Sequence, residues 1–327
     1  MISIKTSINM SSIVVLDGFT LNPGDLSWKK LEQLGQVAIY DRTPPELFAE
    51  RAAQAEILIV NKHKIGASEM DALSELKLIA VSATGYNNVD TQAAQDRGIR
   101  VVNVSGYSTP AVVQHVFALL LGLINKVEAH DASVKTGGWS AQQDFSYTLS
   151  TIAEISTLKL GIYGFGRIGQ AVAQAGLAFG MEVLSHHKHP QRDATPGVTF
   201  VSLEELFRQS NVVSLHVPLN DSNRGIVNKD LLGLMPTPAY LINTGRGGLI
   251  NEMDVLQALK DSKLSGAGLD VLSQEPPPVD HPLLRAPNCL ITPHVAWATQ
   301  AARQRLLDEV IQNIEAFRRG EDRNVVV

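Results

Sequence analysis

The amino-acid sequence predicts an α/β protein built from two doubly wound parallel sheets. Short apolar runs alternate with helical patterns over nearly all of its 327 residues, which is typical of βαβ units. A second series of such runs begins near Leu158, after a long helical stretch. This length and this renewed pattern indicate two domains, each with its own core.

The first series of apolar runs predicts five buried strands, because each run is short and almost free of polar residues. The predicted strands are 13–17, 37–40, 57–61, 76–82 and 101–104. Helical spacing lies between them, at 27–34, 44–54, 68–73 and 91–97.

The second series predicts a further parallel sheet by the same reasoning. Its strands are expected at 158–163, 181–185, 212–216, 240–243, 266–269 and 289–292. Helices are expected in the gaps between these strands, for example at 168–179, 203–209 and 253–260. Two long helical stretches, about 109–134 and 298–318, flank this series and are natural crossing points between the domains.

Composition narrows the classes of partner. The net charge is −5 and no run of Lys or Arg occurs, so nothing indicates nucleic-acid binding. Cys289 is the only cysteine, which agrees with a reducing cytosol. Residues 1–12 lack the features of a signal peptide, with Met10 as an alternative start. The longest apolar stretch, 111–124, is too short for a membrane span. We therefore expect a cytoplasmic protein with no membrane partner.

A glycine motif, Gly164-Phe165-Gly166-Arg167-Ile168-Gly169, opens the second series. It follows a predicted strand and opens a predicted helix, which is the context that makes this pattern a dinucleotide fingerprint. Gly164 permits the tight turn, Gly166 the approach of the pyrophosphate, and Gly169 close helix packing. The helix start at Arg167 and Ile168 presents N–H groups to the phosphates. The sequence thus predicts NAD or NADP binding in a Rossmann-like domain.

The strand after this motif lacks an expected acid. An NAD-binding domain usually carries Asp or Glu about 20 residues on, against the ribose 2′-hydroxyl. Here the chain continues Ser185-His186-His187-Lys188-His189. Because His187 and Lys188 can accept a 2′-phosphate, the sequence favours NADP. A metal site in these histidines is not expected, since no carboxylate or cysteine stands at ligand spacing.

Three later residues have the chemistry needed to reduce a 2-keto acid. Arg246, in a glycine-rich loop after a strand, can bind the carboxylate and polarise the ketone. His294 can protonate the developing alkoxide. Glu275 can orient that imidazole through a charge-assisted hydrogen bond. All three follow predicted strands, and ligands bind at the carboxyl edge of such sheets.

From about Ile13 to the C-terminus, the sequence resembles the D-isomer-specific 2-hydroxyacid dehydrogenases, most closely the glycerate dehydrogenase (hydroxypyruvate reductase) group. The motifs that carry the resemblance are Ala83-Thr84-Gly85-Tyr86-Asn87, Gly164–Gly169, His216-Val217-Pro218-Leu219, 243–248, Gly268-Leu269-Asp270-Val271 with Glu275-Pro276, and Pro293-His294-Val295-Ala296-Trp297.

The resemblance implies roles for these residues. Arg246, Glu275 and His294 match the family's catalytic residues. Thr84 and Gly85 match a turn whose N–H groups bind the substrate carboxylate, and Trp297 resembles that of hydroxypyruvate and glyoxylate reducers. The remaining matches are expected to contact the dinucleotide: His216 and Pro218 beside the adenosine half, Thr244 in the loop before Arg246, and Asp270 at the nicotinamide carboxamide.

The resemblance also implies an arrangement of domains. A discontinuous, flavodoxin-like substrate domain comprises about 1–108 plus 299–327, and the dinucleotide-binding domain spans 109–298. The active site is expected in the cleft between them. Family members are usually homodimers joined through the dinucleotide domain, and segment 138–153 has the polarity and aromatic content of such an arm.

Two other functions stay open. A phosphoglycerate dehydrogenase-like enzyme acts on a substrate with a second acidic group, for which the loop Asn61-Lys62-His63-Lys64 offers cations. Some proteins of this fold are instead dinucleotide-sensing, corepressor-like binding proteins, because a fold does not determine its function.

Overall fold

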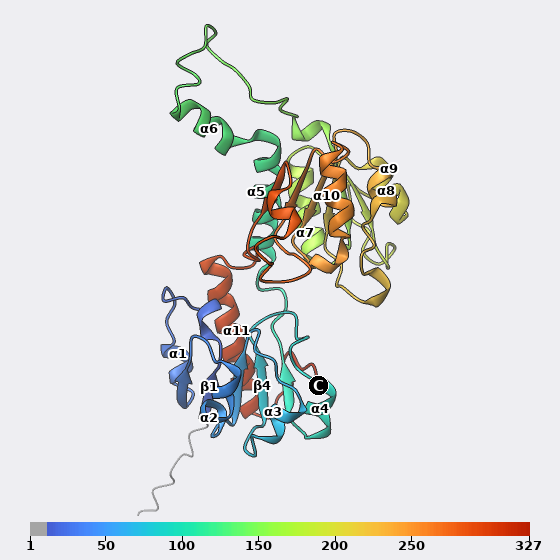
Figure 1. The fold of residues 1–327 in the computed structure, drawn as a ribbon. Coiled ribbons are helices and arrows are strands. Elements are labelled where there is room, and N and C mark those ends of the chain that lie inside the picture. Colours follow the sequence, from blue (N-terminus) through green and yellow to red (C-terminus); the bar gives the residue numbers. More distant parts are fainter. Residues whose placement is uncertain (1–11) are drawn as a thin grey trace, which may run out of the picture. The chain divides into compact units, whose positions relative to one another are not determined.

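The computed structural model describes residues 12–327, so Met10 lies outside the described residues. The chain divides into two compact units. Among the described residues, 12–108 and Ala298–Val327 form the first, and Thr109–Trp297 form the second. Each unit contains one parallel sheet (Figure 1). The predicted fold class of two doubly wound parallel sheets is confirmed.

The first unit has a five-stranded sheet in the order β2-β1-β3-β4-β5. Two of its three inner strands, β3 (Ile57–Val60) and β4 (Leu78–Val81), are fully buried runs of Ile, Leu, Val and Ala. This is expected where both faces of a parallel sheet are covered. The strands are β1 (Ser12–Val15), β2 (Gln36–Ile39), β3 (Ile57–Val60), β4 (Leu78–Val81) and β5 (Arg100–Val102). The helices are α1 (Lys29–Glu32), α2 (Phe48–Ala52), α3 (Ala67–Asp71), α4 (Thr91–Asp96) and α11 (Gln300–Arg318).

The C-terminal segment is anchored in the first unit by apolar and polar contacts. Helix α11 buries one face that includes Leu306, Val310 and Ile314, and it lies beside the strands of its unit (Figure 1). The buried Arg303 makes two hydrogen bonds of 2.6 Å to the Asp25 carboxylate. Beyond the helix, residue 325 forms an antiparallel bridge with residue 102 at the edge of the sheet. These contacts bind residues 298–327 to a core formed by residues 12–108.

The second unit has a seven-stranded sheet in the order β12-β11-β10-β9-β6-β7-β8. The first strand, β6, lies inside the sheet next to β9, and the strand order reverses between them, which creates the switch point at which dinucleotides bind in doubly wound sheets. The strands are β6 (Lys159–Tyr163), β7 (Glu182–His186), β8 (Val198–Phe200), β9 (Val212–Leu215), β10 (Tyr240–Asn243), β11 (Gly266–Leu269) and β12 (Cys289–Ile291).

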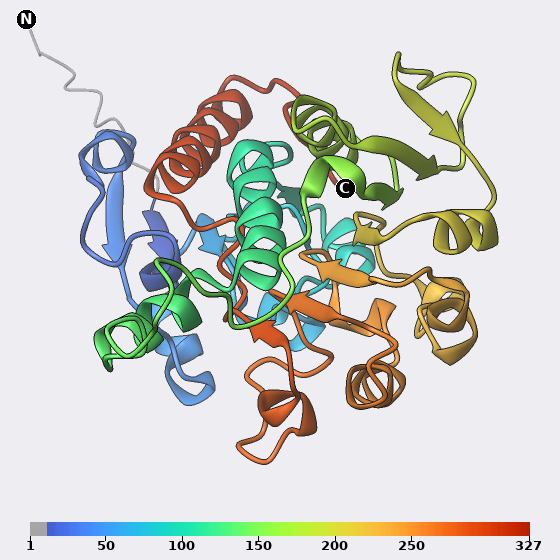
Figure 2. The ribbon, with the colours of Figure 1, turned by 90° about the horizontal axis from the view of Figure 1, so that it is seen from above.

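Helices cover both faces of this second sheet, and each face has its own apolar core. Helices α5 and α7 pack on one face, and α8, α9 and α10 pack on the other (Figure 2). The helices are α5 (Thr109–Asn125), α6 (Val127–Lys135), α7 (Arg167–Ala178), α8 (Leu203–Gln209), α9 (Lys229–Leu234) and α10 (Glu252–Lys260). Short 3₁₀ helices fill several connections in both units.

The structure corrects two details of the expected elements. The single helical stretch expected over 109–134 is two helices, because Lys126 takes a left-handed conformation with φ 48° that ends α5. Strand β8 was not expected, since it is a three-residue, half-exposed edge strand that lacks a buried apolar run.

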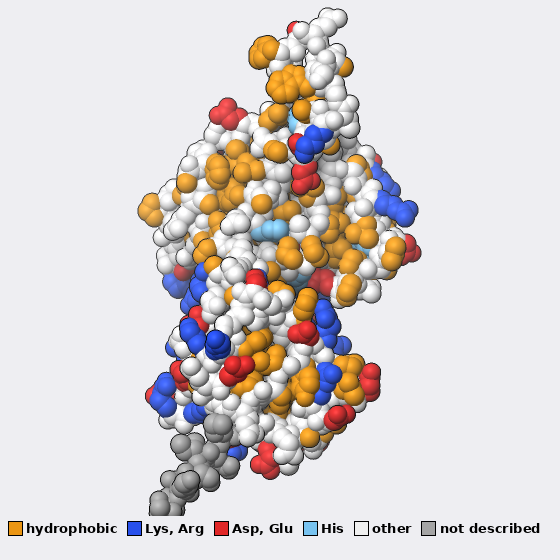
Figure 3. Space-filling view, turned by 90° about the vertical axis from the view of Figure 1, so that its left-hand side faces the viewer, with side chains coloured by type: hydrophobic (Ala, Val, Ile, Leu, Met, Phe, Trp, Pro, Cys, Tyr) orange, Lys and Arg blue, Asp and Glu red, His pale blue; other side chains and the backbone are white. Residues whose placement is uncertain are grey.

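Helix α6 and the segment that follows it extend away from the second sheet (Figure 1). We name residues 127–153 the arm. Its exposed apolar side chains include Val127, Trp139, Phe145, Leu149 and Ile152, and hydrophobic groups are visible on it at the top of Figure 3. No single helix within residues 12–327 has the length and apolarity of a membrane span, and only α5 and α6 together, across a 50° bend, satisfy that test.

Candidate active site

The glycine loop after β6 needs a glycine at two positions for steric reasons. Gly164 has φ 101°, and a Cβ there would lie 2.6 Å from Val217 Cγ1 and 2.7 Å from the His216 carbonyl carbon. A Cβ on Gly169 would collide with the Gly164 carbonyl oxygen. At Gly166, by contrast, a Cβ would meet nothing within 4 Å. The open space at Gly166 leaves the backbone accessible to a ligand, as pyrophosphate binding requires.

Two more features of the second unit fit a bound dinucleotide. Helix α7 begins at Arg167 with no side-chain cap, so its first N–H groups, including that of Ile168, are directed toward the space beside Gly166. Thr244 follows β10, and its buried hydroxyl has no hydrogen-bond partner within residues 12–327. A buried hydroxyl without a partner is costly unless a ligand satisfies it. The residues present therefore fit NAD or NADP.

The structure supplies an acid that the sequence pattern did not place near β7. Asp193 folds back so that its Oδ2 lies 2.7 Å from His187 Nε2. Arg192 donates to both oxygens of the same carboxylate, at 2.9 and 2.7 Å. These contacts lower the pKa of Asp193 to about 2, with the Arg192 hydrogen bond as the largest cause. The carboxylate is therefore ionised and already satisfied by two partners.

His187 is also tied to the glycine loop. Its Nδ1 accepts a hydrogen bond of 3.2 Å from the Phe165 backbone N–H. An accepting Nδ1 places the ring proton on Nε2, where it is donated to Asp193. The ring of His187 thus buttresses the loop, while the neighbouring Lys188 side chain is exposed. The sequence pattern gave no sign of this contact, because it depends on the fold of 190–193.

His216 and Pro218 form a rigid connection after β9. The His216 N–H donates to the Tyr163 carbonyl at 2.7 Å, and its Nε2 lies 2.8 Å from the Ser214 hydroxyl. Burial lowers the pKa of His216 to about 4. The Pro218 carbonyl accepts a hydrogen bond from Asn223. Both residues lie at the carboxyl edge near Gly164, and these hydrogen bonds hold the connection in place.

His294 and Glu275 form an ion-pair geometry at the same edge. The distance from His294 Nδ1 to Glu275 Oε2 is 2.7 Å. The two side chains are 26% and 36% exposed, so the imidazole is reachable while its Nδ1 is occupied. Its Nε2 is left to meet a ligand. The backbone of His294 has φ 54°, a left-handed conformation that a histidine rarely adopts.

Asp270, at the end of β11, holds the segment on both sides of His294. It is 1% exposed. Its oxygens accept from the Thr292 hydroxyl at 2.6 Å and from the Val295 and Ala296 N–H groups at 2.9 Å each. Burial opposes ionisation, but these hydrogen bonds and His115 together lower the pKa of Asp270. The structure therefore places Asp270 as an anchor of this turn.

Arg246 lies in a loop shaped by the neighbouring asparagine. The Asn243 side chain accepts from the Gly245 N–H at 3.0 Å and donates to the Arg246 carbonyl at 2.9 Å. A Cβ on Gly247 would overlap the backbone of Leu272, so this loop packs against the segment that leads to Glu275. The half-buried guanidinium donates at 2.8 Å to the Gly245 carbonyl.

A further cluster supports the Glu275 segment, and sequence reasoning missed it. Glu252, at the start of α10, accepts from the Ser273 N–H at 2.8 Å and from the Ser273 hydroxyl at 2.7 Å. His281 Nε2 lies 3.3 Å from the same carboxylate. His115 on α5 was missed in the same way, although a histidine within an apolar helix was a visible signal. Glu252 and His281 thus hold the segment that carries Glu275, and His115 contacts the segment that carries His294.

Thr84 and Gly85 lie in the first unit, in the turn after β4. The Thr84 hydroxyl donates to the Val104 carbonyl at 2.8 Å, and the Thr84 carbonyl accepts from Asn103 at 2.8 Å. The backbone N–H groups of Thr84 and Gly85 make none of the hydrogen bonds found within the described part of the chain. The turn is thus fixed while two donors stay available.

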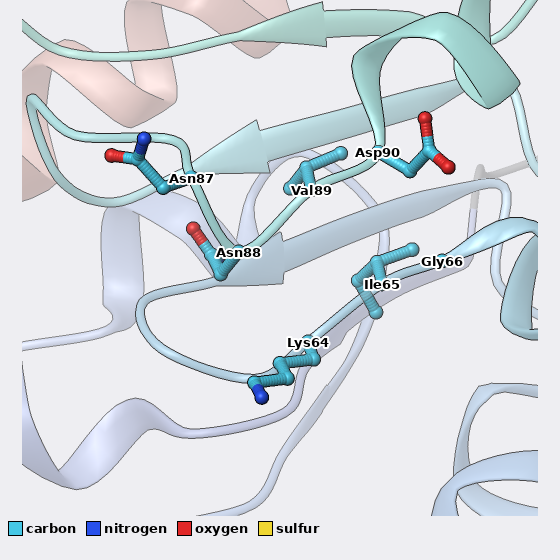
Figure 4. Close-up of a pocket in the computed structure, with 7 residues that line it drawn as sticks. All are labelled: Lys64, Ile65, Gly66, Asn87, Asn88, Val89 and Asp90. Atoms are coloured by element: carbon cyan, nitrogen blue, oxygen red, sulfur yellow. The ribbon is translucent and has the colours of Figure 1, made fainter. Parts of the chain in front are cut away.

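A pocket of about 350 Å³ lies between the loops that follow β3 and β4 in the first unit. Figure 4 shows that the Lys64 ammonium and the Asp90 carboxylate lie at opposite ends of this pocket. Asn88 links the two loops, because its amide donates to the His63 carbonyl at 2.9 Å. The polar groups do not converge, so this pocket offers no charged site of its own.

Trp297 is the last residue of the second unit and is half-buried.

Within residues 12–327, no three His, Cys, Asp or Glu side chains gather in a way that could hold a metal ion. The predicted residues of the second unit thus lie along one sheet edge, with His294, Glu275 and Asp270 in one connected group.

Comparison with known proteins relates the chain to one enzyme family. Residues 117–296 match the model of the "D-isomer specific 2-hydroxyacid dehydrogenase, NAD binding domain". A hydroxypyruvate reductase of Blautia hydrogenotrophica is 41% identical over 319 residues, which cover 96% of this chain and 99% of the relative. A glycerate dehydrogenase of Methylorubrum extorquens is 42% identical over 284 residues, or 86% and 88% of the two chains.

A solved structure shares the fold over almost the whole chain. It is an acyclic imino acid reductase in complex with NADPH and D-Arg, with a TM-score of 0.85 and 32% sequence identity. The match covers 97% of this chain and 100% of that one. Because this neighbour is named for a different substrate, the choice of substrate must be argued from the site.

Proposed function

We propose, from the premise that this chain belongs to the D-isomer-specific 2-hydroxyacid dehydrogenase family, that it reduces hydroxypyruvate to D-glycerate and also accepts glyoxylate. The family makes it an NAD(P)-dependent oxidoreductase of 2-hydroxy acids, as the sequence predicted. The 2.7 Å contact between His294 and Glu275, beside a fitting dinucleotide loop, is the observation that supports the mechanism most directly.

The second unit supplies the proton. Glu275 accepts a hydrogen bond from the Nδ1–H of His294, which leaves Nε2 to face the substrate oxygen. The keto carbon would accept its hydride from a reduced nicotinamide held beside the glycine loop. As negative charge develops on the oxygen, His294 Nε2–H donates its proton and the carbonyl becomes an alcohol. Glu275 stabilises the imidazolium before the transfer and keeps the ring oriented after it.

Substrate binding falls to Arg246 and to the first unit. The Arg246 guanidinium can bind the carboxylate and the keto oxygen as a fork. The available N–H groups of Thr84 and Gly85 add donors for the carboxylate, and Trp297 limits the size of the group beyond the keto carbon. In this proposal the first unit is the substrate domain, and the second unit is the dinucleotide-binding domain.

For the cofactor, we propose a preference for NADPH over NADH. Asp193 is the first acid after β7 along the chain, but Arg192 and His187 already satisfy it. The exposed Lys188 ammonium adds a positive charge after the end of β7, where a 2′-phosphate would lie. Replacing Lys188 with Ala should raise KM for NADPH about tenfold and leave KM for NADH within about twofold, as expected for one lost phosphate contact.

His187→Asp provides the reciprocal test of the cofactor site. A carboxylate at this position should shift the preference toward NADH, because it can bind the ribose hydroxyls and repels a phosphate. An unchanged ratio of kcat/KM for the two cofactors in both variants would show that the end of β7 does not contact the ribose. Exposed Lys135→Ala on α6 serves as the control for a lost surface charge.

The direct test of function is an initial-rate comparison of hydroxypyruvate, glyoxylate and 3-phosphohydroxypyruvate, each with NADH and NADPH. We expect the highest kcat/KM for hydroxypyruvate. A preference for 3-phosphohydroxypyruvate would favour the phosphoglycerate dehydrogenase-like function, with a role for the lysines of loop 61–64. Tight dinucleotide binding without turnover of any 2-keto acid would favour a corepressor-like sensor.

We also propose a homodimer formed through the arm. Its exposed apolar residues, including Phe145 at 90% exposure, are what a partner surface of the same kind would cover. Light scattering should give twice the 35.4 kDa chain mass, and Phe145→Ser with Leu149→Ser should give the monomer. The single cysteine further supports a reducing, cytoplasmic location, which cell fractionation would test.

A further inference from the structure

The turn that carries His294 is held against its conformational preference. His294 has φ 54°, and its N–H donates to both the Asp270 and Thr292 carbonyls at 2.9 Å. A left-handed histidine persists only where the surroundings impose that conformation. The groups that impose it therefore determine where the imidazole lies.

Three groups on either side of His294 converge on the buried Asp270 carboxylate. The Thr292 hydroxyl lies two residues before the histidine, and the N–H groups of Val295 and Ala296 follow it. Because one carboxylate that is 1% exposed binds all three, the turn cannot shift without breaking hydrogen bonds to a buried charge.

His115 completes this arrangement from helix α5. Its Nε2 lies 2.8 Å from Thr292 Oγ1 and 3.4 Å from Asp270 Oδ1. The Thr292 hydroxyl has one proton and donates it to Asp270 at 2.6 Å. It can therefore only accept from His115, which must carry its proton on Nε2. The donors run in one direction, from His115 to Thr292 to Asp270.

We propose that His115 is a positioning residue for the proton donor His294. It acts through Thr292 and Asp270 and does not touch the substrate. The chain of hydrogen bonds fixes the Thr292 hydroxyl in the rotamer that serves Asp270, and thereby fixes the turn. This inference rests on the proposed role of His294 and deepens it. Loss of the chain should lower kcat, because proton transfer depends on the position of the imidazole, and should change KM little.

The test compares two replacements of His115 with a control on the same helix. His115→Leu removes the donor, and His115→Gln keeps an N–H donor at the position of Nε2. We expect kcat to fall about 10- to 100-fold in the Leu variant with KM within about threefold, and to recover to within about threefold of wild type in the Gln variant. The control, Gln114→Leu, alters an exposed neighbour and should leave kcat unchanged.

Thr292→Val tests the same chain from its middle and remains informative if a His115 variant fails to fold. It should lower kcat to a similar extent, and the double variant His115→Leu/Thr292→Val should be no slower than the slower single variant within about twofold, because both remove one connected element. Fully additive losses, or equal losses in the Leu and Gln variants, would overturn the proposal.

Amide hydrogen exchange separates this proposal from the proposed function. The Val295 and Ala296 amides should exchange at least about tenfold faster in His115→Leu than in wild type or Gln114→Leu, because opening of the turn exposes them. This readout needs no substrate. Faster exchange in a protein that reduces no 2-keto acid would support the chain of hydrogen bonds from His115 and reject the enzymatic role. Unchanged exchange would reject the chain of hydrogen bonds.

Discussion

At the carboxyl edge of each sheet, one Asp carboxylate accepts three hydrogen bonds from a neighbouring loop. The two carboxylates differ in their surroundings. Asp17, after β1, accepts from the N–H groups of Asn61, Lys62 and His63 at 2.6 to 2.9 Å. Asp270, after β11, accepts from Val295, Ala296 and the Thr292 hydroxyl at similar distances.

The difference lies in burial and in what each loop carries. Asp17 keeps part of its surface exposed, and its loop adopts ordinary backbone conformations. Asp270 is 1% exposed, and its turn holds a left-handed His294 paired with Glu275. A carboxylate that accepts three hydrogen bonds thus holds two loops of different character. We infer that the first edge provides a recognition surface, and that the second provides a rigid seat for a residue that moves a proton.

The largest expected effect is on the proton donor. His294→Gln should lower kcat by about 10²–10⁴-fold, because general acid catalysis typically contributes that much. The dissociation constant of NADPH should stay within about twofold, since the dinucleotide loop lies elsewhere in the unit. Stopped-flow reduction and fluorescence titration measure the two quantities. A variant that retained wild-type turnover would remove His294 from the mechanism.

The next effect compares the two organising carboxylates. Asp270→Asn should cost about 2–4 kcal/mol of stability in the second unit, because an amide cannot accept from all three buried donors. Asp17→Asn should cost only about 1 kcal/mol in the first unit, where water can replace lost hydrogen bonds. The free energy of unfolding should be measured separately for each unit by amide hydrogen exchange, because a chain with two units need not unfold in one step.

Asp131→Asn, which breaks a surface pair with Lys135 on α6, is the control and should change stability by less than about 0.5 kcal/mol. Equal losses in the Asp17 and Asp270 variants would mean that burial does not separate the two edges.

Acidification should affect the second unit first. The pKa of His216 is lowered to about 4 by burial, so between pH 6.5 and 4 the unfolded chain binds a proton that the folded chain does not. Stability then falls as pH falls through this window, by at most about 3 kcal/mol. In the first unit the Arg303 guanidinium lowers the pKa of Asp25. Its contribution is therefore present above pH 3.8 and is lost only at lower pH.

His216→Gln should flatten the pH dependence of unfolding between pH 6.5 and 4, and Asp25→Asn should alter it only below that window. The measurement is a series of urea titrations from pH 7 to 3.5. A slope that persists in His216→Gln would assign the acid sensitivity to other groups.

The smallest effect is expected at the turn after β4. Thr84→Val removes the hydrogen bond to the Val104 carbonyl and should loosen the donors proposed for the substrate carboxylate. We expect KM for hydroxypyruvate to rise about three- to tenfold with kcat within about twofold. Thr136→Val, at the exposed end of α6, is the matched control. A fall in kcat without a change in KM would contradict a recognition role for this edge.

Much of the fold was predictable because its signals are local. Strands such as β10 and β11 are uninterrupted buried runs, and their bounds agree with the sequence pattern to the residue. Edge strand β8 and the break at Lys126 were not predictable, since the first has no apolar run and the second depends on a single backbone conformation.

The candidate site divides in the same way. Gly164, Arg246, Glu275 and His294 were recognisable because their residue types follow strands in a specific order. The roles assigned to them remain proposals. Asp193, Glu252 and His115 act through partners brought close by folding, as in the 177-residue separation between His115 and Thr292.

The sequence by itself determined the class of this protein: two parallel-sheet domains, a dinucleotide loop and membership of the 2-hydroxyacid dehydrogenases. Periodicity and motifs are properties of neighbouring residues, so they can be read along the chain. Only the tertiary structure decided which partners each functional side chain has. Examples are the hydrogen bonds that satisfy the Asp193 carboxylate and those of Asp270 that hold the turn around His294. Hydrogen bonds between distant segments make that decision, and they exist only once the sheet has brought its loops to one edge.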